Sequence, residues 1–282
     1  MASPSPKSVI VTGGASGIGL AMSRHFASSG HRVAILDVNG DSGPATAAAV
    51  AAEFPQARVS FRKCDVSSWA DQAAAFEHVY RDHGGRIDVV MANAGVSEQG
   101  ATTLVHRLDE EEDSPSPPNL ATININLVGT IYSVKLAVHY MRKGGKAGGD
   151  EGASRGSIIC SASNAGLYAL PVAPLYATSK FGVVGLVRST ARVLARLDIQ
   201  INALAPAVLD TNIAPNKDLF KHMVVTPMST LIRGVDGFLA DPGLTGAVAE
   251  IHGDSVTIRP PHEYVDTESE QNIETFWTLG YA

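Results

Sequence analysis

The sequence predicts an α/β fold in which about seven parallel strands form one doubly wound sheet with helices on both faces. Three observations support this prediction. Short apolar segments alternate with helix-like segments along the 282 residues. A glycine-rich turn joins the first apolar segment to the first helix-like one. Polar residues follow several of the apolar segments, as expected where strands end at the functional edge of a parallel sheet.

The composition excludes several classes of function. The chain is 45% hydrophobic and 18% charged, with a formal net charge of -6 and without a basic run. We therefore expect no nucleic-acid partner and no anionic-membrane partner. Because no run of about 18 apolar residues occurs, no membrane-spanning segment is predicted. The first eight residues are polar, so a signal segment is not predicted either.

The two cysteines, Cys64 and Cys160, lie in or beside apolar segments. We interpret them as free core thiols in a reducing compartment, which favours a cytoplasmic protein. The nine histidines are scattered and lack the clustered cysteine or carboxylate ligands of a metal site, so no metal is predicted.

The first predicted strand, 8–12, runs into a glycine turn that opens the first helix, 17–29. The turn reads Thr12-Gly13-Gly14-Ala15-Ser16-Gly17-Ile18-Gly19. Glycines let the backbone approach a pyrophosphate, and a helix N-terminus favours an anion. An ordinary turn with glycine at positive φ is the alternative. The flanking strand and helix favour a dinucleotide site.

The second predicted strand, 31–37, ends at Asp37, about 20 residues after the glycine turn. An acid at this position can accept hydrogen bonds from the adenosine ribose hydroxyls and would repel a 2′-phosphate. Neither Val38 nor Asn39 supplies a cation. The alternative is an aspartate that only caps the next turn.

The middle of the chain continues the alternation. Helices are predicted at 42–53 and 69–83, and a longer one that carries Asn126 at 119–141. Strands are predicted at 58–63 and 87–91, followed by Asp65-Val66 and Asn93-Ala94-Gly95. Residues 100–118, with the acidic run 109–113, and the glycine-rich stretch 144–156 are predicted to be surface loops.

The second half contains a pair of residues with acid/base potential. Ser163 follows a strand predicted at 157–161, and the helix within 171–197 carries Tyr176 and Lys180. Four residues make about one helical turn, so these two side chains share a face. A neighbouring ammonium favours the phenolate and would lower the phenol pKa from about 10. Chance spacing on a solvated helix face is the alternative.

The last third contains two more strands, a lid and a tail. Strands are predicted at 198–204, just before Pro206, and at 246–252, with a helix at 227–240 between them. Segment 207–227 is interpreted as a lid over a substrate pocket, and residues 253–282 as a tail. The lid residues that suggest a mostly apolar ligand are Asn212, Ile213, Leu219, Phe220, Met223 and Val224.

Together these motifs resemble the short-chain dehydrogenase/reductase family over residues 8–252, within a single Rossmann-type domain spanning 1–282. The details are most similar to its NAD-dependent 15-hydroxyprostaglandin dehydrogenase branch and fungal relatives. The resemblance implies that the catalytic residues are Asn126, Ser163, Tyr176 and Lys180. It implies that NAD is bound by Tyr176 and Lys180 and by Gly13, Ser16, Gly17, Ile18, Gly19, Asp37, Asp65, Val66, Asn93, Ala94, Gly95, Pro206, Leu209 and Thr211.

In this resemblance Tyr176 is the general acid/base, and Lys180 binds the nicotinamide ribose and lowers the Tyr176 pKa. Ser163 orients the substrate oxygen; Ser161 competes for that role by residue type, but Ser163 has the family's thirteen-residue offset to Tyr176. Asn126 holds a water in a proton relay. Two features depart from the family pattern: Ala207 stands in place of the usual glycine after Pro206, and the tail after Gly253 is longer.

We expect an NAD-dependent oxidoreductase that interconverts a small, mostly apolar secondary alcohol and its ketone. Two alternatives remain: an NADPH-dependent ketone reductase, and a nucleotide-binding sensor, scaffold or non-redox cyclase on the same fold. The resemblance also implies a homodimer or homotetramer built from the helices that carry Asn126 and Tyr176. Val183, Val187 and Leu194 are candidates for that interface, with core packing as the alternative.

Overall fold

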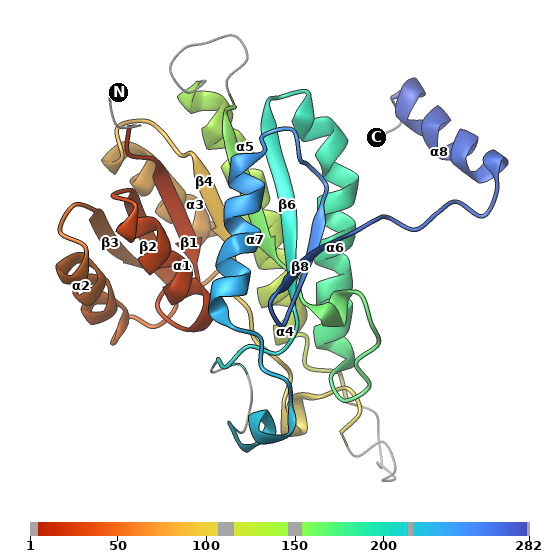
Figure 1. Ribbon diagram of the computed structural model, residues 1–282, viewed down its shortest axis with the longest axis horizontal. Helices are drawn as coiled ribbons and strands as arrows, with labels where there is room; N and C mark the ends of the chain where they lie inside the picture. Colours follow the sequence, from red (N-terminus) through yellow and green to blue (C-terminus); the bar gives the residue numbers. More distant parts are fainter. Residues whose placement is uncertain (1–4, 107–115, 146–153, 212, 214–216, 281–282) are drawn as a thin grey trace.

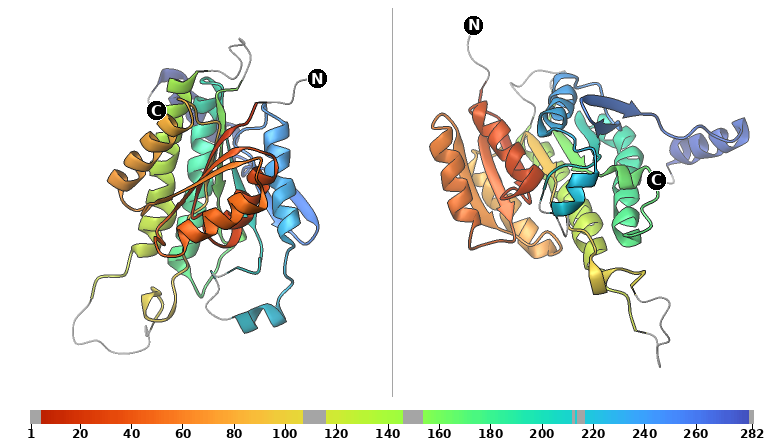
Figure 2. Two further views of the ribbon diagram at one scale, coloured as in Figure 1. Left: turned by 90° about the vertical axis from the view of Figure 1, so that its left-hand side faces the viewer. Right: turned by 60° about the horizontal axis from the view of Figure 1, so that its bottom comes forward.

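A computed structural model describes residues 5–106, 116–145, 154–211, 213 and 217–280. They form an eight-stranded sheet in the order β3-β2-β1-β4-β5-β6-β7-β8, with helices on both faces (Figures 1 and 2). Strands β1 to β7 are parallel, and β8 is antiparallel to β7. The acidic run 109–113, most of the glycine-rich loop and Asn212 lie outside the described residues.

The strands are β1 (Ser8–Thr12), β2 (Arg32–Asp37), β3 (Arg58–Lys63), β4 (Val89–Ala92), β5 (Gly156–Ser161), β6 (Ile199–Pro206), β7 (Val248–His252) and β8 (Ser255–Arg259). The helices are α1 (Gly17–Ser28), α2 (Gly43–Glu53), α3 (Trp69–Asp82), α4 (Ala121–Ile123), α5 (Gly129–Gly144), α6 (Pro174–Ala195), α7 (Met228–Ala240) and α8 (Thr267–Leu279). Short 3-10 turns lie at Gly100–Thr102, Asn164–Gly166 and Lys217–His222.

The central strands are buried on both faces, which explains their continuous apolar sequences. In β1, Ile10 belongs to the core beneath α3, α5 and α6, whereas its neighbours Val9 and Val11 belong to the core beneath α1, α2 and α7. This is the two-residue alternation of a strand between two helical layers. The predicted doubly wound parallel sheet is therefore confirmed.

The two cysteines and the proposed interface residues have clear positions. Among the described residues, Cys64 and Cys160 are both free and buried, and burial raises the pKa of each thiol to about 12. Val183, Val187 and Leu194 pack inside the core. Of the two interpretations, core packing is therefore the one that holds, because the three side chains lie on the face of α6 that covers the sheet.

The helix predicted at 119–141 extends from Ala121 to Gly144. It is helical throughout and contains a π-helical turn at Asn124–Val128. Its length and composition would allow it to cross a membrane. In the fold it is a core helix, because Ala137 is fully buried and the Gly129 carbonyl accepts a hydrogen bond from Gln72 on α3.

The C-terminal region contains two elements that the sequence did not predict. Strand β8 forms a hairpin with β7, and α8 follows after an extended segment that leaves the sheet (Figure 1). No residue of α8 is buried. It is attached through Glu274, which pairs with Arg192 at 2.6 Å, and through Trp277, whose ring centre lies 4.5 Å and 4.2 Å from the guanidinium carbons of Arg192 and Arg196.

A buried polar cluster joins the amino ends of β1 and β4. The Ser8 hydroxyl lies 2.7 Å from His83 Nδ1, and the Ser8 amide donates to Asp88 Oδ2 at 2.7 Å. The other ring nitrogen of His83, Nε2, has no hydrogen-bond partner among the described residues. Burial lowers the pKa of His83 to about 4, so the ring is neutral in the folded protein at neutral pH.

This cluster predicts a loss of stability in mild acid. Between pH about 6.5 and about 4, the unfolded chain binds a proton at His83 that the folded chain does not bind. The free energy of unfolding therefore falls as the pH falls through this window, by at most about 1.36 kcal/mol per pH unit for this group. We expect the free energy of unfolding, measured by urea titration at several pH values, to fall less steeply with decreasing pH in His83→Asn than in the parent. Exposed His78→Gln is the control, and an unchanged slope in His83→Asn would refute the assignment.

Candidate active site

The glycine turn after β1 fits an anion such as a pyrophosphate. Gly13 has φ +61°, and a Cβ there would lie 2.8 Å from Ala94 Cα. A Cβ on Gly19 would lie 2.0 Å from the Gly13 carbonyl oxygen. Within the described chain, the first turn of α1 has no acidic residue, and Ser16 makes no side-chain cap. The first N–H groups of α1 are thus open to an anion, which the helix dipole favours.

Asn93 ties together the ends of β1, β4 and β5. Its amide N–H donates to Thr12 Oγ1 at 2.9 Å, and its Nδ2 donates to the Thr12 carbonyl at 3.1 Å. Its Oδ1 accepts a hydrogen bond from the Ser161 hydroxyl at 3.0 Å. Ala94 also donates to Thr12 Oγ1, at 3.1 Å. These bonds hold the segment Asn93-Ala94-Gly95 beside the glycine turn, as the sequence predicts.

Asp37 has the position expected of a ribose ligand and also acts as a local cap. Its two carboxylate oxygens accept from the amides of Ala15 and Asn39, each at 3.0 Å. The sequence interpretation did not include Lys63, which lies in register with Asp37 on β3. The Lys63 side chain passes Gly40, where a Cβ would lie 3.1 Å from its Cδ. Lys63 and Asp37 are therefore neighbours across β2 and β3, and the Lys63 side chain extends past Gly40.

The two residues expected near adenine are arranged differently from each other. The Asp65 carboxylate accepts from the amide and the hydroxyl of Ser67, at 2.9 Å and 2.7 Å, so it stabilises its own turn. Val66 is buried, and its carbonyl accepts from Gln72 at 2.6 Å. Contact of either residue with adenine stays a prediction.

Asn126 lies in the π-helical turn between α4 and α5. Its Oδ1 accepts from the Val96 amide at 2.8 Å, and its Nδ2 donates to the Val96 carbonyl at 2.8 Å and to Ser179 Oγ at 3.0 Å. Both N–H donors of the side chain are therefore in use. This side chain braces the loop after Gly95, and its role in a proton relay stays a prediction.

Lys180 is buried at the end of β5. Its ammonium donates to the Ser161 carbonyl at 2.7 Å, and burial lowers its pKa to about 8. The Nζ atom lies 5.5 Å from the ring centre of Tyr176. The one-turn spacing therefore brings the two side chains together, as the sequence predicts.

The ionisation of Tyr176 differs from the expectation. Burial raises the pKa of its phenol above the ordinary value, and the nearby Ser163 hydroxyl lowers it by less. The lowered pKa expected from Lys180 is thus wrong for the protein alone, because desolvation of the phenolate dominates.

The two candidate serines have different partners. The Ser161 hydroxyl donates to Asn93, whereas the Ser163 hydroxyl donates to Asn164 Oδ1 at 3.2 Å and lies near enough to the Tyr176 phenol to lower its pKa. Ser163 also begins the 3-10 turn 164–166, where its hydroxyl accepts from the Ala165 amide at 3.2 Å. Of the two hydroxyls, that of Ser163 is the one beside the phenol.

The far side of the site begins where β6 ends. Pro206 is the last residue of β6, Leu209 is buried, and Thr211 lies near the glycine turn, 3.5 Å from where a Cβ on Gly17 would be. Ala207 donates to the Ile251 carbonyl at 2.8 Å and does not have positive φ, so a glycine is not required there.

The lid residues do not form an apolar wall in this structure. Phe220 is partly buried, but Ile213, Met223 and Val224 are exposed, Val224 by 84%. The Leu219 side chain and Asn212 lie outside the described part of the chain. The apolar character of the ligand stays a prediction.

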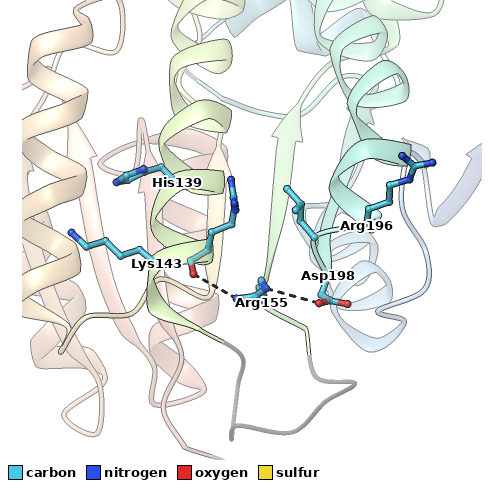
Figure 3. Close-up of a pocket in the computed structure, with 7 residues that line it drawn as sticks. His139, Lys143, Arg155, Arg196 and Asp198 are labelled. Carbon is cyan, nitrogen blue, oxygen red and sulfur yellow. Dashed lines mark hydrogen bonds and ion pairs between the residues drawn. The ribbon is translucent and has the colours of Figure 1, made fainter. Parts of the chain in front are cut away.

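A cavity of about 440 Å³ lies at the amino ends of the strands, on the side of the sheet away from the glycine turn (Figure 3). Two of its residues show this position, because Arg155 precedes β5 and Asp198 precedes β6. Basic side chains at the ends of α5 and α6 line it, and such cations compensate the dipoles of helix C-termini. Arg155 Nε lies 3.9 Å from Asp198 Oδ2. This cavity is separate from the residues around Tyr176. Its full lining is His139, Arg142, Lys143, Arg155, Arg196, Leu197 and Asp198.

One further buried residue was missed by the sequence interpretation. Glu98 follows the Asn93-Ala94-Gly95 motif and contacts the first turn of α6. The signal that could have revealed it is at the helix itself: Pro174 begins α6 and Ala173 has no side chain able to cap it.

The short chain dehydrogenase family matches residues 7–221. The chain therefore belongs to this family. It is 39% identical to a short-chain dehydrogenase/reductase, prx4, of Penicillium roqueforti over 210 residues, which are 74% of this chain and 56% of prx4. This chain thus spans little more than half the length of that relative.

Two other similarities cover more of both proteins. The 15-hydroxyprostaglandin dehydrogenase [NAD(+)] of Mus musculus is 31% identical over 87% of this chain and 89% of its own length. The crystal structure of NADPH-dependent 3-quinuclidinone reductase from Rhodotorula rubra has a TM-score of 0.70 and 25% identity, covering 90% of this chain and 92% of that chain.

Proposed function

We propose that this protein is an NAD(H)-dependent oxidoreductase that interconverts a secondary alcohol and a ketone by hydride transfer. One observation carries the proposal: the buried Lys180 ammonium is held by the Ser161 carbonyl with its Nζ 5.5 Å from the ring centre of Tyr176, and Ser163 lies near the Tyr176 phenol, at the strand ends that also hold the glycine turn. A positioned acid/base and a nucleotide cradle at one edge are the two parts that this reaction needs.

A bound nicotinamide cofactor supplies the hydride acceptor or donor. Tyr176 takes the proton of the alcohol during oxidation and returns it during reduction. Ser163 orients the substrate oxygen toward the phenol, and Lys180 offers a cation to the phenolate and donors to the cofactor ribose. Asn126 holds the loop after Gly95 in place. The positive charge of an oxidised nicotinamide favours the phenolate and so opposes the effect of burial on the Tyr176 pKa.

Asp37 supports NAD as the cofactor, because its carboxylate would repel a 2′-phosphate. The NAD-dependent mouse relative is consistent with this choice. NADPH is the second candidate, favoured by Lys63 beside Asp37 and by the NADPH-dependent structural neighbour. We favour NAD because Asp37 is bound directly to the glycine turn, through Ala15.

The substrate is proposed to be small and mostly apolar, on the basis of the apolar lid sequence. A homodimer or homotetramer is proposed through α5 and α6. Exposed Ile131, Phe181 and Val193 on these helices support this in place of the buried residues first considered. A cytoplasmic location is proposed from the two free, buried thiols.

Tyr176→Phe should lower turnover by about 10²–10⁴-fold, because it removes the positioned acid/base. NAD binding should be nearly unchanged, since the phenol oxygen is the only atom lost. In the parent, alcohol oxidation should rise with pH through one ionisation and then level off, because the phenolate is the base. Steady-state rates measured against pH check the turnover and the ionisation, and titration with the cofactor checks its binding. Turnover within a few-fold of the parent would exclude Tyr176 from the reaction.

Replacing Ser163 should lower turnover more than replacing Ser161. Ser163→Ala should lower turnover by about tenfold or more, because it removes the group that orients the substrate oxygen. Ser161→Ala should lower it less, because the hydroxyl is used by Asn93 and the carbonyl that holds Lys180 is retained. The reverse order of the two rates would assign the role to Ser161.

Asp37→Ala should weaken NAD binding by about tenfold or more, since a charge-assisted hydrogen bond contributes about 1.5–3 kcal/mol. NADP should bind more tightly relative to NAD, because the carboxylate that repels the 2′-phosphate is gone while the Lys63 cation remains. The double variant Asp37→Ala/Lys63→Ala should bind NADP more weakly than Asp37→Ala does, whereas its affinity for NAD should equal that of Asp37→Ala. Dissociation constants for both cofactors check this. Unchanged constants in Asp37→Ala would show that the aspartate only caps the turn.

A further inference from the structure

Helix α6, which carries Tyr176 and Lys180, begins without a cap of its own. Pro174 occupies its first position and has no N–H, and Ala173 before it makes no side-chain hydrogen bond. The first N–H groups that need an acceptor are therefore those of Leu175 and Tyr176. In a half-buried helix start these donors must be satisfied by another part of the chain.

Glu98 supplies that acceptor from 77 positions away. Its Oε1 accepts from the Leu175 amide at 2.6 Å and from the Tyr176 amide at 3.1 Å. The side chain is only 4% exposed. A buried carboxylate at a helix N-terminus is favoured by the dipole and replaces the missing local cap.

The second carboxylate oxygen of Glu98 binds the loop that follows it, and the neighbouring Gln99 contacts the lid. Its Oε2 accepts from the Leu104 amide at 3.1 Å, and the next side chain, Gln99, donates to the Ile213 carbonyl of the lid at 3.1 Å. Two residues earlier, the Val96 backbone is bonded to Asn126 on both its N–H and its carbonyl. Segment 96–99 therefore links Asn126, the start of α6 and the lid.

Tyr176 and Lys180 are held by different contacts. Lys180 is anchored to the Ser161 carbonyl at the end of β5, one turn further along α6. The backbone of Tyr176 is held at the helix end, where Glu98 accepts from its own N–H. Loss of Glu98 would free the first turn while leaving Lys180 in place, and would misplace the phenol relative to Ser163.

We propose that Glu98 is a positioning residue that fixes the Tyr176 phenol by capping helix α6. This inference rests on the proposed function, because it concerns how the acid/base is placed for that reaction. Glu98 does not touch the reacting atoms and acts only through the backbone of Leu175 and Tyr176.

Steady-state kinetics of three variants test the proposal, with the secondary alcohol that the parent oxidises fastest in a panel of cyclic and aliphatic alcohols. Glu98→Ala should lower kcat by about tenfold to a hundredfold, the cost of a small misplacement. The dissociation constant of NADH should be unchanged. Glu98→Gln should recover much of kcat, because its amide oxygen can still accept from the Leu175 and Tyr176 N–H groups, although its NH2 group cannot accept from Leu104. Asp266→Ala is the matched control, since Asp266 caps α8 in the tail through the Ser269 amide.

Amide hydrogen exchange gives a second readout that does not depend on turnover. Exchange at Leu175 and Tyr176 should be faster in Glu98→Ala than in the parent and should be restored in Glu98→Gln. If Glu98→Ala does not fold, Glu98→Asp replaces it: the shorter acid keeps the charge but not the reach, and its kcat should lie below that of Glu98→Gln.

The outcomes separate the two proposals. Parent-like kcat in Glu98→Ala, or in Glu98→Asp if that variant is used, overturns the positioning role while leaving the oxidoreductase intact, provided that Tyr176→Phe is impaired. Parent-like exchange at Leu175 and Tyr176 also overturns it. A parent protein that oxidises no alcohol and reduces no ketone overturns the proposed function, and the inference about Glu98 with it.

Discussion

The hydrogen bond between the buried Lys180 ammonium and the Ser161 carbonyl is the interaction on which the rest of the site depends. A buried ammonium is unfavourable unless it is hydrogen-bonded, and the last carbonyl of β5 supplies the acceptor. This bond fixes α6 against the end of the strand. The middle of α6 also lies close to the 3-10 turn after Ser163, since a Cβ on Gly166 would lie 2.6 Å from the Lys180 carbonyl oxygen.

Features encoded within a few neighbouring residues were predictable. The glycine turn, Asp37 and the Tyr176/Lys180 spacing each lie within one strand end or one helical turn, so local rules place them on the correct edge. Strand β8 and helix α8 were not predictable in this way. Helix α8 has no buried face and is held by Arg192 and Arg196, about 80 residues earlier, through Glu274 and Trp277.

The sequence can show that α6 begins without a local cap, but it does not show which distant residues complete the site. Glu98 is one acid in an irregular segment until α6 brings two unsatisfied N–H groups to it. Lys63 becomes relevant only through the register of β2 and β3. The spacing of Tyr176 and Lys180 indicated a lowered phenol pKa, but desolvation, a property of the folded surroundings, has the opposite and larger effect.

The π-helical turn at Asn124–Val128 gives its helix a fixed rotational phase. Its ring is closed by the Gly129 amide and the Asn124 carbonyl, five residues apart, so the turn holds one residue more than an α-helical turn. Within this turn Asn126 hydrogen-bonds with Val96, and after it Ala137 lies in the core. Deleting one codon here would leave a regular α-helix whose two halves keep nearly the same phase, because five residues of a π-helical turn rotate the chain about as far as four residues of an α-helix. A deletion in the α-helical part of the same helix would instead rotate one half against the other by about 100°, so the tolerance of this helix to a change of length is confined to the π-helical turn.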